Sequence, residues 1–273
     1  MLTNNIIFRF LTHNRILNPI RFSAMMGRMA SRKIPGFVLH PMIRLYIWHY
    51  NIDMNDYDIE IKNIKTFNEF FTRKLKSGAR KFEGKLLSPS DSKITDFGKV
   101  NNNIKLAIKG MECSINELLY EKNEFILSSF TVFYLSPADY HRFHAPFDME
   151  IEKIAYVPGK LHSVKPKKLE NYSDLYCLNR RVILFGTSQY GKFAMILVGA
   201  LVVGRIVLSF HPLKNRRKHQ YYNVNYLIKK GEELGYFELG STIILLTESE
   251  VLASLNKSTG DHVKVGEELF SEY

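Results

Sequence analysis

The segment Gly235-Tyr236-Phe237-Glu238-Leu239-Gly240-Ser241-Thr242 runs directly into the apolar run Ile243-Ile244-Leu245-Leu246. This apolar run predicts a β-strand over Thr242–Thr247. Glycine leaves its carbonyl sterically open, and a serine hydroxyl is a weak nucleophile until a base and an orienting acid activate it. The Gly240–Ser241 pair is therefore either an ordinary turn before a strand or a reactive junction.

Two upstream segments contain residues that could activate this serine. They are Ser88-Pro89-Ser90-Asp91 and Tyr140-His141-Arg142-Phe143-His144-Ala145-Pro146. An aspartate after Ser-Pro is also typical of a turn or a helix cap, and two histidines three residues apart would suit a metal site if they lay on a helix. Pro137 and Pro146 bracket the histidines, so we expect a loop there. Because no cysteine or third histidine lies nearby at a zinc-like spacing, we expect no metal.

Together these segments resemble the bacterial type of phosphatidylserine decarboxylase proenzyme. The resemblance runs in the family's order from about position 66 to the C-terminal region. Besides the segments quoted above, the blocks that carry it are Thr66-Phe67-Asn68-Glu69-Phe70-Phe71-Thr72-Arg73-Lys74-Leu75, Phe133-Tyr134-Leu135-Ser136-Pro137, Val157-Pro158-Gly159-Lys160-Leu161, Val198-Gly199-Ala200-Leu201-Val202-Val203-Gly204 and Lys230-Gly231-Glu232-Glu233-Leu234-Gly235.

The resemblance implies a chain that cuts itself between Gly240 and Ser241. In that family the serine attacks the preceding glycine carbonyl and forms an ester, and elimination and hydrolysis leave a pyruvoyl group on the new N-terminus. The products here would be a long chain, 1–240, and a short chain, 241–273. The resemblance also implies that Asp91 and His144 form a triad with Ser241, with His144 as general base and Asp91 holding its tautomer.

The implied reaction of the mature enzyme is the decarboxylation of phosphatidylserine to phosphatidylethanolamine. The pyruvoyl cofactor derived from Ser241 would form a Schiff base with the substrate amine and accept the electrons that carboxylate loss releases. His141 matches the family's second histidine, so we expect a proton donor or a contact to the substrate carboxylate. The alternative role for His141 is that of a structural partner of a nearby carbonyl. The resemblance also implies a homodimer.

Three positions depart from the family pattern. Ser90 and Ser92 flank Asp91 where alanine and glycine are common, and Arg180 stands where an acidic residue is usual. If that glycine has a positive φ, Ser92 would carry a modest backbone strain. None of these positions belongs to the implied triad.

The N-terminal fifty residues are basic and amphipathic. The whole chain carries a formal net charge of +11, and its first fifty residues contain no Asp or Glu. Their basic residues are Arg9, Arg15, Arg21, Arg28, Arg32, Lys33 and Arg44. These alternate with apolar residues at helical spacings, and Met42–Tyr50 adds an aromatic-rich stretch around Trp48. We therefore expect helices that lie in the headgroup region of an anionic membrane without spanning it.

This expectation places the protein peripherally on the cytoplasmic face of the cell membrane, or at the mitochondrial inner membrane in a eukaryote. An Arg-rich transit peptide is an alternative for the N-terminus, whereas no apolar core of a secretory signal is visible. Lys214–His219 could contact phosphates, but without a nucleic-acid motif we expect a solvated loop or a lipid contact, and no nucleic-acid partner.

The pattern predicts a mostly β, α+β fold with an antiparallel, sandwich- or barrel-like core. Residues 1–84 are expected to form a helical, membrane-associating region and residues 85–273 a β-rich catalytic domain. Ser114 is expected to cap a short helix over Ser114–Leu119, with Glu117 completing a capping box. The tail Gly260–Glu267 resembles an element of lipoyl-carrier hybrid folds. The expected strands are Phe130–Leu135, Glu150–Val157, Arg181–Thr187, Lys192–Val198, Val202–Phe210 and Thr242–Thr247.

Two other classes of function remain open at the level of sequence. A conventional serine hydrolase would use Asp91, His144 and Ser241 in an uncut chain, although no Gly-x-Ser-x-Gly elbow surrounds the serine. A non-catalytic carrier or lipid-binding domain is suggested by the tail alone. Cys113 and Cys177 belong to no recognisable metal or redox motif.

Overall fold

The computed structural model describes residues 27–100, 105–108, 111–121, 127–164, 175–200, 205–214, 218–238 and 241–270. Predictions that concern residues 1–26, Gly240 and part of the Lys214–His219 cluster lie outside these ranges.

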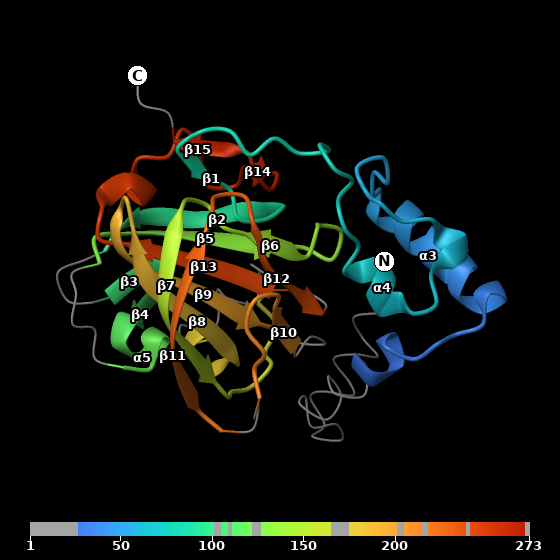
Figure 1. The fold of residues 1–273 in the computed structure, drawn as a ribbon, viewed down its shortest axis with the longest axis horizontal. Coiled ribbons are helices and arrows are strands. Elements are labelled where there is room, and N and C mark those ends of the chain that lie inside the picture. The colour runs from blue at the N-terminus through green and yellow to red at the C-terminus, as the bar shows by residue number, and fades with distance from the viewer. Residues whose placement is uncertain are drawn as a thin grey trace.

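An eight-stranded antiparallel sheet forms the centre of the protein (Figure 1). Its strands, in spatial order, are β11 (Gln220–Ile228), β7 (Met149–Val157), β8 (Arg181–Ser188), β9 (Gly191–Gly199), β13 (Ser241–Thr247), β5 (Ser129–Leu135), β2 (Ser92–Lys99) and β14 (His262–Val263). The predicted mostly β, antiparallel core is therefore confirmed.

Three smaller sheets complete the β structure of the described residues. They are β10 (Arg205–Leu208) with β12 (Glu233–Glu238) and β6 (Arg142–His144), then β1 (Leu86–Leu87) with β15 (Glu268–Phe270), and β3 (Lys105–Ile108) with β4 (Met111–Ser114). Besides a helical turn at residues 27–30, the described helices are α3 (Gly36–Tyr50), η1 (Ile61–Asn63), α4 (Phe67–Phe71), α5 (Ile115–Leu119), α7 (Leu175–Leu178) and η2 (Glu250–Ala253).

The central strands of the large sheet are buried on both faces, and β13 shows the division between them. Ile243 and Leu245 belong to an apolar cluster that includes Phe143 of β6 and Phe237 of β12. The alternate residues of the strand, Ile244 and Leu246, belong to a second cluster with residues of α5 and α7. Because successive side chains of a strand point to opposite faces, the three-stranded sheet covers one face of β13 and the short helices lie over the other.

The predicted strands agree closely with the observed ones. Five of the expected ranges match β5, β7, β8, β9 and β13 within one residue at each end. Of the range expected at Val202–Phe210, residues 202–204 lie outside the described residues, and β10 covers Arg205–Leu208 and ends two residues before Phe210. Ser114 caps α5 by accepting a hydrogen bond from the Glu117 backbone N–H at 3.4 Å, as predicted.

Two local expectations are revised. The two histidines were expected to lie on a loop, which holds for His141, but His144 lies on a strand because Arg142–His144 forms β6 by pairing with β12. Ser92 was considered as a strained position, yet it opens β2 and is not among the described residues with a positive φ. An extended backbone suits serine as well as glycine, so this departure from the family pattern carries no strain of that kind.

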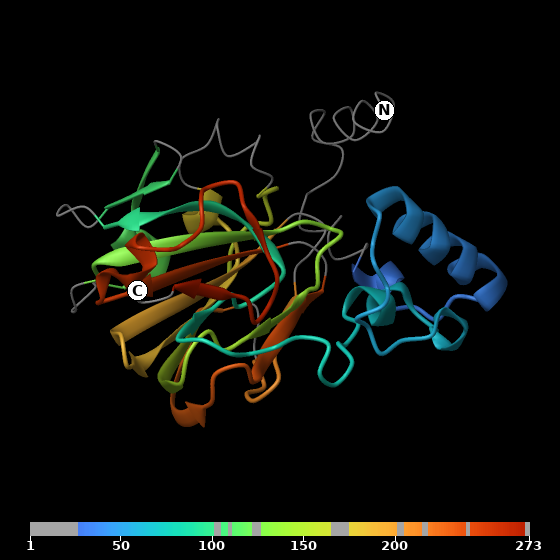
Figure 2. The ribbon, with the colours of Figure 1, turned by 90° about the horizontal axis from the view of Figure 1, so that it is seen from above.

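The helices α3 and α4 lie beside the β structure, on the side where β6, β10 and β12 end (Figure 2). α4 covers Phe67–Phe71 and is capped by Thr66, whose hydroxyl accepts from the Glu69 N–H at 3.1 Å. Within the described ranges, no helix is long and apolar enough to cross a membrane.

Candidate active site

Ser241 is the first residue of β13 and is fully buried. It is paired with Leu135 of β5 on one side and with Gly199 of β9 on the other. Its hydroxyl oxygen is buried and has no hydrogen-bond partner among the described residues. A buried, unsatisfied hydroxyl costs roughly 1–3 kcal/mol, so its presence calls for an explanation beyond folding.

The face on which Ser241 lies follows from strand alternation. Ser241 shares the face of Ile243 and Leu245, which the three-stranded sheet with β6 and β12 covers. Thr242 also has a buried hydroxyl without a partner in the described structure, but it lies on the opposite face with Ile244. Of the two hydroxyls, only that of Ser241 is therefore directed to the layer that carries the histidines.

The loop 136–141, which carries His141, is connected near its two ends to Ser241 and to Phe237. One end of the loop follows Leu135, the strand partner of Ser241. At the other end, the His141 carbonyl accepts a hydrogen bond from the Phe237 N–H at 2.9 Å. The loop is thus attached to residues 237 and 241, on either side of Gly240, which itself lies outside the described residues.

His144 has a defined tautomer because of its partners. Its Nδ1 lies 2.8 Å from the Gly231 carbonyl, which can only accept, so Nδ1 carries the proton. The unprotonated Nε2 accepts from the Tyr140 hydroxyl at 3.1 Å. Burial lowers the pKa of His144, while the hydrogen bond to the Gly231 carbonyl opposes this shift. The ring is therefore neutral with a lone pair on Nε2, which is the form that a general base requires.

His141 is also held in one tautomer. Its Nδ1 donates to the Asp139 carbonyl at 2.8 Å, and its Nε2 is buried without a partner among the described residues. The ring lies against Phe71, with 4.1 Å between ring centroids. Burial lowers the pKa of His141 to about 3, so the ring is neutral. In this state Nε2 can accept a proton but has none to donate.

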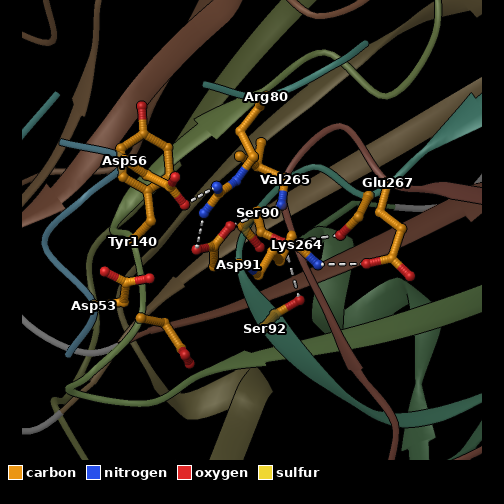
Figure 3. A network of polar contacts seen from close by, with 12 residues as sticks. Asp53, Asp56, Arg80, Ser90, Asp91, Ser92, Tyr140, Lys264, Val265 and Glu267 are labelled. Carbon is orange, nitrogen blue, oxygen red and sulfur yellow. Dashed lines mark hydrogen bonds and ion pairs between the residues drawn. The ribbon is translucent and has the colours of Figure 1, made fainter. Parts of the chain in front are cut away.

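Asp91 lies just before β2, and both of its carboxylate oxygens have partners (Figure 3). One oxygen accepts from the Val265 N–H at 2.8 Å, and the other lies 3.4 Å from a guanidinium nitrogen of Arg80. Burial raises the pKa of Asp91, whereas the hydrogen bond from Val265 and the positive charge of Arg80 oppose that rise.

The structure brings Asp91 and His144 near each other but does not join them by a hydrogen bond. The His144 N–H donates to the Pro89 carbonyl at 2.8 Å, so β6 is attached to the turn that carries Asp91. The charge of Asp91 is close enough to raise the pKa of His144 slightly against the effect of burial. No hydrogen bond joins His144 to Ser241 in the described structure, since Gly231 and Tyr140 are the partners of its ring nitrogens.

Several residues that shape this site were not identified from the sequence. Tyr140 stands next to His141 in the quoted motif, and that position was the only available signal. Arg73, which follows α4, donates to the Ala138 carbonyl at 3.1 Å and, more weakly, to the Asp139 carbonyl at 3.5 Å, so it supports the loop 136–141. Arg80 and Gly231 act through contacts that no local pattern indicates. Within the described ranges, no group of three or more His, Cys, Asp or Glu could hold a metal ion.

An antiparallel β core has a buried serine without a hydrogen-bond partner among the described residues, in the layer that carries His141 on a loop and His144 on β6. These features define a candidate serine-based enzyme. The family model described as phosphatidylserine decarboxylase matches residues 67–271. The chain belongs to the phosphatidylserine decarboxylase family.

Curated relatives agree with this assignment. A phosphatidylserine decarboxylase proenzyme of Vibrio vulnificus (strain YJ016) is 38% identical over 245 residues, which cover 84% of this chain and 86% of the relative. The proenzyme of Campylobacter jejuni subsp. jejuni is 36% identical over 262 residues, or 90% of this chain and 97% of the relative. The proenzyme of Dechloromonas aromatica is 35% identical over 258 residues, or 90% and 91% of the two chains.

Proposed function

We propose that this chain is a proenzyme that cuts itself between Gly240 and Ser241 and then decarboxylates phosphatidylserine to phosphatidylethanolamine. The observation that carries the proposal is the Ser241 hydroxyl, which is buried, unpartnered in the described structure and directed to the histidine-bearing layer. The names of the relatives, which are phosphatidylserine decarboxylase proenzymes, support both the substrate and the processing.

For self-cleavage, His144 is the proposed general base. Its Nε2 lone pair would take the hydroxyl proton as the Ser241 oxygen attacks the Gly240 carbonyl, and the ring would return a proton to the leaving nitrogen. Nε2 now accepts from Tyr140, so the transfer exchanges one hydrogen bond for another. The Asp91 carboxylate would stabilise the imidazolium by its charge, and the Gly231 carbonyl holds the tautomer that leaves Nε2 free to act.

For decarboxylation, Ser241 would itself be converted into the pyruvoyl group, and its buried position suits a reaction that must exclude water. When present, that group supplies a ketone that takes up the substrate amine and draws off the electron pair released with carbon dioxide. His141 is proposed to contact the substrate carboxylate or to transfer the proton that the product needs. Its bare Nε2 would first take up a proton, which a carboxylate beside the ring favours by raising the pKa.

The proposed short chain, 241–273, would stay attached after the cut. β13 lies in the middle of the large sheet, between β9 and β5, while β14 and β15 pair with β2 and β1. We propose residues 85–273 as the catalytic domain and residues 1–84 as the membrane-associating region. We also propose that the tail Gly260–Glu267 forms an element like that of lipoyl-carrier hybrid folds. We propose in addition that the protein is a homodimer.

The proposed membrane contact includes the outer side of α3. Phe37 and Trp48 are 83% and 77% exposed, and Leu45 between them is 61% exposed. Large apolar side chains exposed together on one helix favour insertion into a headgroup region, and the basic N-terminal sequence favours an anionic lipid. We propose peripheral attachment on the cytoplasmic face of the membrane.

Two substitutions on adjacent residues test the proposal. Ser241→Ala should abolish both cleavage and the release of carbon dioxide from phosphatidylserine. Thr242→Val, which removes the neighbouring buried hydroxyl from the opposite face, should leave cleavage at Gly240–Ser241 in place. An intact wild-type chain whose Ser241 reacts with a serine-directed probe would instead indicate a conventional hydrolase.

A further inference from the structure

Arg80 lies between two carboxylates that come from distant parts of the chain (Figure 3). One guanidinium nitrogen forms an ion pair with Asp56, which precedes η1, and another lies 3.4 Å from Asp91. The three side chains are 10%, 29% and 14% exposed for Arg80, Asp56 and Asp91 respectively. Because the three side chains are largely shielded from water, their ion pairs are stronger than an exposed ion pair.

The two oxygens of Asp91 are held in different ways. The Val265 N–H fixes one oxygen, and Arg80 faces the other. Within the described structure, Arg80 is the only cation in ion-pair contact with Asp91. The other titratable or charged groups that act on Asp91, or on which it acts, are Lys264, Asp139, His144, Tyr57 and Tyr140.

We propose that Arg80 is a positioning residue for self-cleavage, which keeps the Asp91 carboxylate ionised and fixed near His144, and that Asp56 moderates its influence. This inference rests on the proposed function, because it presumes that Asp91 supports His144 during the cut. Arg80 contacts neither the serine hydroxyl nor any other proposed reacting atom in the described structure, so it acts through Asp91.

The physical basis is a balance between burial and charge. Burial alone favours the protonated acid at Asp91, and the guanidinium opposes this. Asp56 shares the guanidinium, whose hydrogen bond lowers the pKa of Asp56 itself. Loss of Arg80 should therefore favour protonated Asp91, whereas loss of the Asp56 charge leaves the whole positive charge to Asp91. The two changes should act in opposite directions.

The experiment measures the rate of self-cleavage against pH. Full-length precursor is made by cell-free translation and transferred into a series of buffers from mildly acidic to mildly basic, and the cut is followed on gels. In Arg80→Gln the acidic limb of the profile should move to higher pH by about one unit, so that cleavage on that limb slows roughly tenfold. In Asp56→Asn the limb should move to lower pH, and Arg80→Lys should stay near the wild type.

Two controls separate positioning from folding. Lys153→Gln breaks another partly buried ion pair, with Glu121, that does not contact Asp91, and it should leave the limb in place. In an Asp91→Asn background the residual cleavage follows His144, so adding Arg80→Gln should no longer move the limb. If Arg80→Gln does not fold, the Asp56→Asn and Arg80→Lys profiles decide the question.

The outcomes distinguish the inference from the proposed function. Opposite displacements by Arg80→Gln and Asp56→Asn, lost without Asp91, support the positioning role. The positioning role of Arg80 is overturned if the acidic limb does not move in Asp56→Asn, or if Arg80→Gln and Asp56→Asn move it in the same direction. Neither result contradicts self-cleavage. A wild-type chain that stays uncut, or an Asp91→Asn chain cut at the wild-type rate, contradicts the proposed function instead.

Discussion

The β body, residues 85–270, and the N-terminal segment, residues 27–84, contribute to the site in different ways. The β body fixes Ser241 by backbone pairing, since every residue of β13 has a partner on both β5 and β9. The N-terminal segment instead reaches the loop 136–141 mainly through side chains. Tyr46 donates to the Pro137 carbonyl at 2.8 Å, and Arg73 donates to the Ala138 carbonyl at 3.1 Å.

The comparison indicates a division of tasks. Sheet pairing fixes Ser241, and the helical segment holds the loop 136–141, which ends at His141. The β body also donates to the N-terminal segment, since Arg142 of β6 donates to the Thr72 carbonyl at 2.9 Å. The same segment also presents the exposed apolar side of α3, so one part of the chain would contact both the lipid and the site.

The largest expected effect is on self-cleavage, and it comes from replacing His144 in the β body. His144→Ala should slow self-cleavage by roughly 10²–10⁴-fold, the range typical of a lost general base. His141→Ala should be cut normally but fail in decarboxylation, because His141 is assigned only to the second reaction. Gel analysis of the precursor and carbon dioxide release from phosphatidylserine measure the two steps. Equal rates of self-cleavage in His144→Ala and His141→Ala would show that His144 is not the general base.

The pH dependence of stability tests the burial of His141. Its folded pKa, about 3, lies below the usual value of 6.5, so the unfolded chain binds a proton more readily than the folded one. The stabilisation is complete above about pH 6.5 and is lost as pH falls from there toward 3. Relative to His141→Asn, the wild type should lose roughly 1 kcal/mol for each pH unit in this window. Parallel curves from urea unfolding of the two proteins would show that His141 is protonated freely.

A smaller effect is expected at the contact between the two regions. Arg73→Met removes a buried guanidinium that donates to the loop and lies 4.1 Å from the Tyr57 ring centroid. The free energy of unfolding should fall by about 2–3 kcal/mol, and turnover by the mature enzyme should fall with it. Lys62→Gln, which breaks an exposed ion pair in the same segment, should change that free energy by less than about 0.5 kcal/mol. Similar losses in the two variants would show that Arg73 does not hold the loop.

The smallest effect concerns the outer side of α3. Trp48→Ser should weaken binding to anionic vesicles about tenfold, because a large aromatic side chain no longer enters the headgroup region. Leu227→Ser in β11 is the matched control, since Leu227 is 78% exposed and Trp48 77%. Vesicle flotation measures both. Equal binding by the two variants would place the lipid contact elsewhere.

The sequence predicts the parts of this protein that depend on local pattern. The apolar run after Ser241 is sufficient to indicate β13, and Ser114 with Glu117 indicates the start of α5. It fails at Arg142–His144, which becomes a strand only by pairing with residues about ninety positions away. Such long-range partners leave no periodic signal in a three-residue stretch.

For the candidate site, the sequence predicts the reacting residues but not the residues that hold them. The resemblance predicts Asp91, His141, His144 and Ser241 as site residues, but not the partners that set their protonation. The Gly231 carbonyl, which fixes the His144 tautomer, is 87 residues away in the chain. Arg73 and Arg80 would be expected at the surface from their type, because a buried arginine needs acceptors that only the folded chain supplies.

The most direct test of self-cleavage is the intact mass of the purified protein under denaturing conditions, without added substrate. The account predicts two fragments, 1–240 and 241–273, with the short one lighter by one ammonia than a peptide that begins with Ser241. That deficit corresponds to a pyruvoyl group in place of an N-terminal serine. A single full-length mass from folded protein, or a short fragment with an ordinary N-terminal serine, would contradict it.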